Sequence, residues 1–184
     1  MENEHTKIVI IPGLGGSNAN HWQSYWLKQY DNTLEIVQDN WDAPKLELWL
    51  KTLQDCLIKI DSPTVLVAHS LGVSLVLHWA RQYTNPHIKG ALLVAPADVD
   101  SPTHTPESIR GFSPMPITTL PFSSIVVASE NDDYVSIPRA EYFSKQWGSD
   151  FINIGTKGHI NSDSNLKYWE EGQRILDTLL DKTD

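Results

Sequence analysis

The residues best placed to do chemistry form the pentapeptide Ala68-His69-Ser70-Leu71-Gly72. An apolar, β-branched run precedes it and an almost wholly apolar run follows it, so the chain must turn from strand to helix within two residues. A serine in such a turn stands clear of the sheet, above the positive end of the following helix. The small flanking residues let the two backbones approach. The pattern predicts a nucleophilic Ser70, although a serine at a helix start also fits a simple N-cap.

An activated serine needs a base within about 3 Å, and histidine titrates near neutral pH. The segment Gly155-Thr156-Lys157-Gly158-His159 follows a short apolar run, and its glycines hold a loop that presents one histidine. The other six histidines lack this setting, and most of them fit the surface-loop alternative. We therefore predict that His159 is the base, with a surface-loop histidine as the simpler alternative.

Such a base needs a carboxylate that fixes its tautomer and stabilises the imidazolium. An acidic turn follows the apolar run 124–129, and Asp132 lies at its tip. We predict Asp132 as this acid, with Asp133 next and Asp98 or Asp100 as further alternatives. The resulting chain order of serine, aspartate and histidine is the order found in α/β-hydrolases.

A glycine-rich turn, residues 12–17, follows the first apolar run. Acyl transfer needs two N–H donors aimed at the developing oxyanion. The amide of the residue after the nucleophile, Leu71, is one expected donor, and the Leu14 amide is the other. An ordinary strand–helix turn is the alternative for this segment.

The same turn also resembles a dinucleotide-binding fingerprint, because Gly13 and Gly15 are followed by Asp39 after the second strand. The third glycine of that fingerprint is missing, since position 18 is Asn18. The chain also leaves no room for a separate substrate domain. A cofactor-binding function is therefore the weaker interpretation, and we expect no cofactor.

Short apolar runs alternate with helical patterns along the chain. Strands are expected at 7–11, 34–37, 64–68, 90–94, 124–129 and 151–154, and helices over 22–29, about 42–60, 71–83, 138–148 and about 166–180. This alternation predicts a parallel sheet covered on both faces, with the active groups at the carboxyl ends of the strands. The proline-rich, weakly periodic segment 97–122 predicts a long loop, which is functional or mobile.

The bulk properties fit a soluble globular protein. A length of 184 residues suits one domain spanning the whole chain, and a net charge of −9 argues against nucleic acid and anionic membranes as partners. The single cysteine, Cys56, fits a reducing compartment. The acidic start does not resemble a secretory signal, and no apolar run approaches the ~20 residues of a membrane span. These features predict a cytoplasmic protein.

The chain resembles the small α/β-hydrolases of the YdeN and retinoblastoma-binding-protein-9 type. The matching pieces are Pro12-Gly13-Leu14-Gly15, His21-Trp22-Gln23, Asn40-Trp41, Ala68-His69-Ser70-Leu71-Gly72, Ala95-Pro96, Ala128-Ser129, Asn131-Asp132, Gln146-Trp147-Gly148 and Gly158-His159-Ile160-Asn161. The resemblance implies a three-layer α/β-hydrolase fold with a six-stranded, mostly parallel sheet, no cap domain, and no metal or cofactor. It also implies Asp132 as the acid, although Asp133 stands where the family usually has proline.

The expected function is a serine hydrolase of the carboxylesterase type that acts on small acyl substrates, with amides or peptides also possible. Without a cap, we expect an open, shallow pocket walled partly by the segment 97–122 and by Trp22. The alternative is an idle or weak hydrolase-fold protein that acts as a protein-binding or regulatory module.

Overall fold

A computed structural model describes residues 6–182. The expectation that the chain start is not a secretory signal concerns residues 1–5, which lie outside the described residues. Six strands form one sheet in the order β2-β1-β3-β4-β5-β6, and every neighbouring pair is parallel. The strands are β1 (Lys7–Ile11), β2 (Thr33–Glu35), β3 (Thr64–His69), β4 (Ile88–Val94), β5 (Ser123–Ala128) and β6 (Asp150–Asn153).

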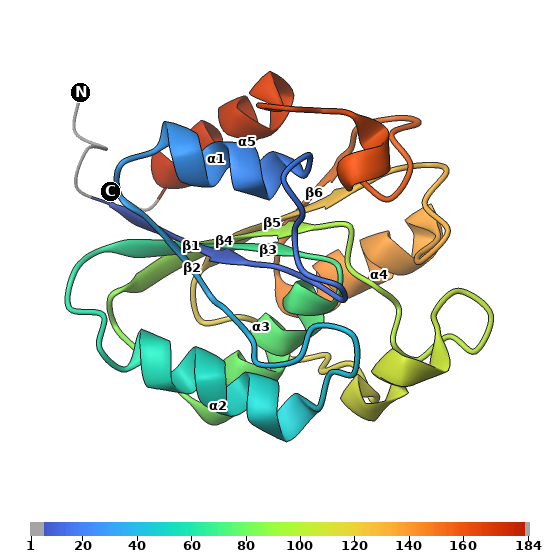
Figure 1. The fold of residues 1–184 in the computed structure, drawn as a ribbon, viewed down its shortest axis with the longest axis horizontal. Helices are drawn as coiled ribbons and strands as arrows, with labels where there is room; N and C mark the ends of the chain where they lie inside the picture. Colours follow the sequence, from blue (N-terminus) through green and yellow to red (C-terminus); the bar gives the residue numbers. More distant parts are fainter. Residues whose placement is uncertain (1–5, 183–184) are drawn as a thin grey trace.

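Five α-helices cover the two faces of the sheet (Figure 1). They are α1 (Trp22–Gln29), α2 (Leu46–Leu57), α3 (Leu71–Gln82), α4 (Ile137–Trp147) and α5 (Glu170–Leu180). Helices α1 and α5 pack on one face, and α2, α3 and α4 pack on the other. One apolar core lies between each face of the sheet and the helices that cover it. This is expected for parallel strands, which are buried on both faces. The predicted α/β fold with helices on both faces is confirmed.

Strand β3 is the centre of the sheet and carries the chain toward the predicted nucleophile. All six of its residues are buried, because helices cover both of its faces. Its register aligns Ala68 with Ile11 of β1 and with Leu93 of β4. The carboxyl ends of the three strands therefore meet at one edge of the sheet, where we expected the chemistry.

Two helix boundaries differ from the expectation. Helix α2 begins at Leu46, not near Asp42, because the Asn40 side chain accepts hydrogen bonds from the Asp42 and Ala43 amides and forms a turn first. Helix α5 begins at Glu170, not near residue 166. The segment before it contains three residues with positive φ, a conformation that a helix does not allow. These are Asn165 (φ 49°), Lys167 (φ 51°) and Trp169 (φ 42°).

The segment 97–122 contains more structure than the sequence predicted. It holds a 3₁₀ helix, η2 (Glu107–Phe112), whose Ile109 and Phe112 side chains are buried in the core. The Asp100 carboxylate accepts hydrogen bonds from the Ser113 hydroxyl and the Met115 amide. The weak periodicity of this segment gave no sign of these contacts, because the two hydrogen bonds join residues 13 and 15 positions apart rather than neighbours on one helix turn.

Candidate active site

The turn between β3 and α3 holds Ser70 in an unusual backbone conformation, with φ 56° and ψ −119°. Positive φ is rare outside glycine, and such strain persists only where the surroundings impose it. The Ser70 amide donates to the Val94 carbonyl oxygen at 3.0 Å, which ties the turn to β4. The Ser70 side chain makes no capping hydrogen bond to α3. The simple N-cap alternative therefore does not describe this serine.

Two glycines allow the close backbone approach that this turn needs. A Cβ atom on Gly72 would lie 2.4 Å from the Ile11 carbonyl oxygen and 2.7 Å from that of Pro12. A Cβ atom on Gly13 would lie 3.1 Å from the Leu71 amide nitrogen. The turn after β1 thus packs directly against the start of α3, which brings two backbone segments to the hydroxyl of Ser70.

The loop after β6 brings His159 to the same place. Its Nε2 atom lies 2.8 Å from Ser70 Oγ, and its Nδ1 atom lies 2.9 and 3.0 Å from the two Asp132 carboxylate oxygens. Because a carboxylate can only accept, Nδ1 carries the proton and Nε2 is the acceptor for the Ser70 hydroxyl. A continuous hydrogen-bonded chain therefore joins the hydroxyl, the imidazole and the carboxylate.

Burial separates Asp132 from the other candidate acids. The Asp132 side chain is 0% exposed and also accepts the Tyr134 amide at 2.8 Å. Asp133 is exposed, and its backbone oxygen rather than its carboxylate bonds to a histidine. Asp98 and Asp100 both form ion pairs with Arg139. Of the candidate carboxylates, only Asp132 is placed against the imidazole.

Leu14 lines the same cavity as Ser70, and Leu71 follows Ser70 directly in the chain. Within residues 6–182, neither amide donates a hydrogen bond to another group of the protein. Leu71 is the first residue of α3, where backbone N–H groups lack an intrahelical partner. Both donors are therefore free for an external acceptor.

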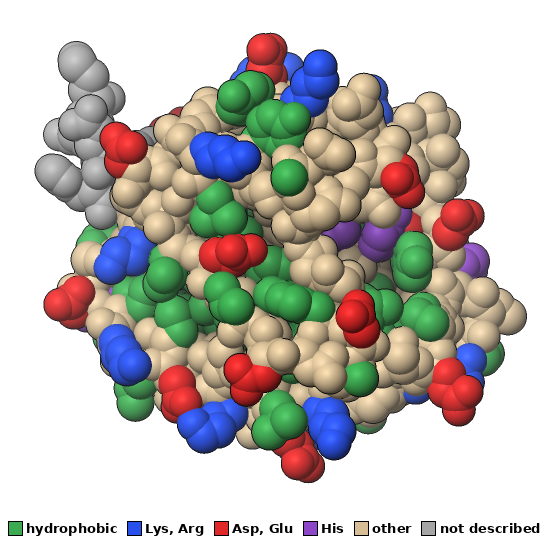
Figure 2. Space-filling view, in the orientation of Figure 1, with side chains coloured by type: hydrophobic (Ala, Val, Ile, Leu, Met, Phe, Trp, Pro, Cys, Tyr) green, Lys and Arg blue, Asp and Glu red, His purple; other side chains and the backbone are tan. Residues whose placement is uncertain are grey.

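A cavity of about 280 Å³ opens beside Ser70. It is lined by Leu14, Gly15, Gly16, Asn18, His21, His69, Ser70, Ile109, Tyr134, His159, Asn161, Ser162 and Asp163. No lysine or arginine contributes to this lining. Figure 2 shows histidine side chains within a recess of the surface. Ile109 brings the segment 97–122 into the wall, as expected.

Trp22 is a correction to the expected pocket wall. It is 0% exposed and does not line the cavity. Its ring packs edge-on against Trp26 and Trp169 in the core between α1 and the sheet. Helical spacing alone could not reveal whether this side chain faces the cavity or the core.

The family model described as serine hydrolase matches residues 8–178. This chain belongs to the serine hydrolase family. The match covers nearly the whole described chain, including every element that carries the site. Among residues 6–182, none of the helices has the combined length and hydrophobicity that a transmembrane span requires.

Several relatives resemble this serine hydrolase in sequence and structure. It is 27% identical over 171 residues to "Putative hydrolase YdeN" of Bacillus subtilis, covering 85% of this chain and 87% of that protein. A crystal structure of a "putative yden-like hydrolase" from Pectobacterium atrosepticum has a TM-score of 0.84 and 29% identity, covering 96% and 91% of the two chains. Est1E of Butyrivibrio proteoclasticus, solved with ferulic acid bound, shares the fold, with a TM-score of 0.70, 16% identity and coverage of 98% and 92%.

Sequence reasoning missed two buried histidines of the serine hydrolase that line the cavity beside His159. Burial, followed by proximity to His159, lowers the pKa of His21 to about 3. Burial, followed by proximity to His21 and His159, also lowers the pKa of His69 well below its usual value. Both side chains are therefore neutral at pH 7. Both residues lie in pieces that carry the family resemblance, His21-Trp22-Gln23 and Ala68-His69-Ser70-Leu71-Gly72, but no sequence signal assigned a role to either histidine.

Two further groups around the base were also missed. The Tyr134 ring packs against the His159 ring, with 4.2 Å between centroids. Ser129 Oγ accepts the Lys157 amide and donates to Asn131 Oδ1, which in turn accepts the Gly158 amide. These contacts join the end of β5 to the loop that carries the imidazole.

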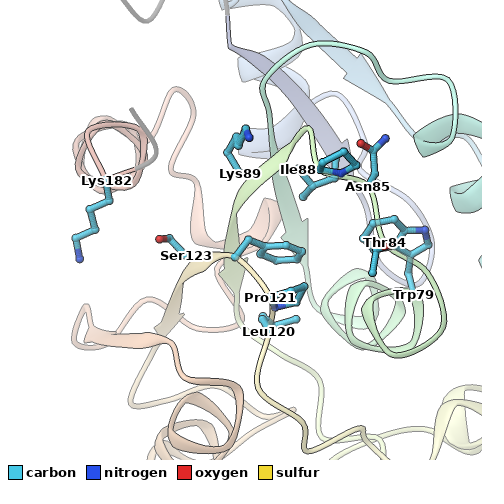
Figure 3. A pocket seen from close by; sticks show the side chains of 11 residues that line it. Trp79, Thr84, Asn85, Ile88, Lys89, Leu120, Pro121, Ser123 and Lys182 are labelled. Atoms are coloured by element: carbon cyan, nitrogen blue, oxygen red, sulfur yellow. The ribbon is translucent and has the colours of Figure 1, made fainter.

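A larger surface hollow, of about 730 Å³, lies away from this site (Figure 3). It is found at the amino ends of β4 and β5, near Ile88 and Ser123, with Lys182 at its edge. Active groups of parallel sheets gather at the opposite, carboxyl ends of the strands. Size alone therefore does not make it the active site. No cluster of three or more potential metal ligands occurs among residues 6–182.

Proposed function

We propose that this serine hydrolase cleaves small carboxylic esters through a covalent acyl-enzyme on Ser70. The observation that carries the proposal is the hydrogen-bonded chain from the Ser70 hydroxyl through His159 to Asp132, with distances of 2.8 to 3.0 Å. Its serine lies in a strained turn above the start of α3. These are the parts that acyl transfer by an activated serine requires.

The geometry supports the following steps. Ser70 Oγ attacks the ester carbonyl carbon while its proton moves to His159 Nε2, and Asp132 stabilises the resulting imidazolium. The Leu14 and Leu71 amides donate to the oxyanion of the tetrahedral intermediate. When the ester C–O bond breaks, the imidazolium gives its proton to the leaving alkoxide. Water then attacks the acyl-enzyme by the same route, which releases the acid and restores the serine.

The cavity sets limits on the substrate. Its volume of about 280 Å³ lies below the usual range of ~300–1,000 Å³ for pockets that hold drug-sized ligands. Asn18, Asn161 and Ser162 line it with polar groups, whereas Leu14 and Ile109 supply apolar surface. We therefore expect acetyl and butyryl esters to react faster than palmitoyl esters.

The test is a panel of p-nitrophenyl esters of increasing acyl length, together with labelling by a fluorophosphonate probe. Ser70→Ala should lose both ester turnover and labelling, and the turnover should fall by up to ~10⁶-fold. Labelling that persists in Ser70→Ala would refute the assignment of the nucleophile. Intact binding of a protein partner without any turnover in the wild type would favour the binding-module alternative.

A further inference from the structure

Two ring N–H groups bind consecutive carbonyls of the loop that carries His159. His69 Nε2 lies 2.9 Å from the His159 carbonyl oxygen, and Trp22 Nε1 donates to the Ile160 carbonyl oxygen at 2.8 Å. The donors come from β3 and from α1, 90 and 138 residues away in the sequence. Their rings also lie against each other, with 6.2 Å between centroids and an interplanar angle of 86°.

The protonation of His69 follows from its partner. A carbonyl oxygen can only accept, so Nε2 carries the proton and His69 is a donor in this contact. Burial keeps the ring neutral by lowering its pKa. A neutral donor beside the base adds no positive charge that would oppose the formation of an imidazolium on His159.

The backbone that these two donors hold is strained. Ile160 has φ 49°, although it is β-branched, and its side chain is 0% exposed. A β-branched residue at positive φ is an outlier that only its surroundings can maintain. Here the surroundings are the two ring donors on one side and the Ser129–Asn131 contacts to the Lys157 and Gly158 amides on the other.

We propose that Trp22 and His69 are positioning residues that hold the strained His159–Ile160 backbone and thereby set the distance from the imidazole to Ser70. This inference rests on the proposed function. Trp22 acts without contact to substrate, because it is buried and lies outside the cavity lining. The loss of its N–H group should let the loop relax and move the imidazole away from the hydroxyl.

The chain offers a matched control in Trp26. Trp22 and Trp26 lie one turn apart on α1, and both are 0% exposed. Trp26 Nε1 donates to the Tyr168 carbonyl oxygen at 2.8 Å, the same kind of bond at the same length. Trp22→Phe and Trp26→Phe therefore each remove one indole hydrogen bond of the same length from the same core, a buried one for Trp22 and a partly buried one for Trp26, but only Trp22→Phe releases the loop of the base.

We expect Trp22→Phe to lower kcat on a short-chain ester by about 10- to 100-fold, since a misplacement of ~1 Å can cost ~10²-fold. KM should change by less than about twofold, because the cavity lining is intact. Trp26→Phe should show a similar loss of thermal stability with kcat within about twofold of wild type. Equal kcat effects for the two variants, or none for Trp22→Phe, would overturn the proposal.

The donor of His69 is tested by a pair of variants. His69→Gln retains an N–H group that can reach the carbonyl, whereas His69→Leu removes it. The kcat of His69→Gln should be at least about tenfold higher than the kcat of His69→Leu. Equal activity of the two variants would show that the N–H group of His69 does not position the loop.

A third readout separates this inference from the proposed function. The His159 Nδ1–H proton, held by the Asp132 carboxylate, should give a low-field proton NMR signal. We expect the signal to weaken or shift in Trp22→Phe and to persist in Trp26→Phe. The NMR signal is measured without substrate, so it does not depend on catalytic activity. An inactive wild type would therefore refute the proposed function alone. An unchanged signal in Trp22→Phe would refute the positioning role alone.

Discussion

Asp132→Asn is the most informative single change, because it keeps the shape of the buried acid and removes its charge. Asp132 accepts the His159 Nδ1–H and the Tyr134 amide with its side chain wholly buried. An asparagine has one carbonyl oxygen and an NH₂ group where the carboxylate had two acceptors. The NH₂ group would either face His159 Nδ1 or displace the contact with the Tyr134 amide. Facing Nδ1, it would donate to that nitrogen and so favour the His159 tautomer with the proton on Nε2.

That tautomer cannot accept the Ser70 proton, so the expected effect is large. The equivalent change in a serine–histidine–aspartate site lowers kcat by about 10⁴-fold, which corresponds to about 5.5 kcal/mol of barrier at ~1.4 kcal/mol per decade. KM should change little, because Asp132 does not line the cavity. Part of the lost rate should return at high pH, where hydroxide can assist the deprotonation of the serine.

The assay is steady-state hydrolysis of a short-chain ester from pH 6 to pH 10, with Asp133→Asn as the matched control. Asp133 is the adjacent aspartate, and its side chain is exposed. Asp133→Asn should stay within about threefold of wild type. If Asp133→Asn lost as much kcat as Asp132→Asn, or if Asp132→Asn kept more than a tenth of it, the assignment of the acid would be wrong.

Three further predictions concern stability and specificity. Gly72→Ala should lower the free energy of unfolding by about 3 kcal/mol or more in urea titrations, because the added Cβ would lie 2.4 Å from a backbone oxygen. The control is Gly111→Ala, whose added Cβ has nothing within 4 Å, and its free energy of unfolding should stay within about 0.5 kcal/mol of wild type. Because the pKa of His21 is lowered to about 3 and that of His69 also falls well below its usual value, the unfolded chain binds protons near pH 6.5 that the folded chain excludes. The free energy of unfolding should therefore fall as the pH drops from about 6.5 toward 4, by up to ~1.4 kcal/mol per pH unit for each histidine, and His21→Asn should reduce this slope in urea titrations at several pH values. The cavity lining contains the carboxylate of Asp163 and no lysine or arginine, so an ester with an anionic acyl group should have a kcat/KM about two- to fivefold below that of a neutral ester of equal length. If the ratio of these two kcat/KM values were the same in Asp163→Asn as in the wild type, this electrostatic effect would be contradicted.

The sequence was informative wherever local backbone constraints leave few solutions. A strand and a helix separated by two residues require a tight turn, and the strained φ of Ser70 and the close approach at Gly72 follow from that requirement. Alternation of apolar runs with helical patterns likewise predicted the parallel sheet and the edge at which the groups gather. Helix starts were less predictable, because the turn before α2 depends on two hydrogen bonds that the Asn40 side chain accepts.

Only the tertiary structure decided where individual side chains point. The sequence placed Asp132 and Asp133 in one acidic turn, but burial against the His159 ring distinguishes them. It also placed Trp22 near the site without showing that its ring faces the core and its N–H group faces the Ile160 carbonyl. These two contacts join residues 27 and 138 positions apart, and they depend on how loops and helices pack against the sheet. Local sequence determines backbone turns and periodicity, whereas packing over the whole chain determines the partner of each buried polar group.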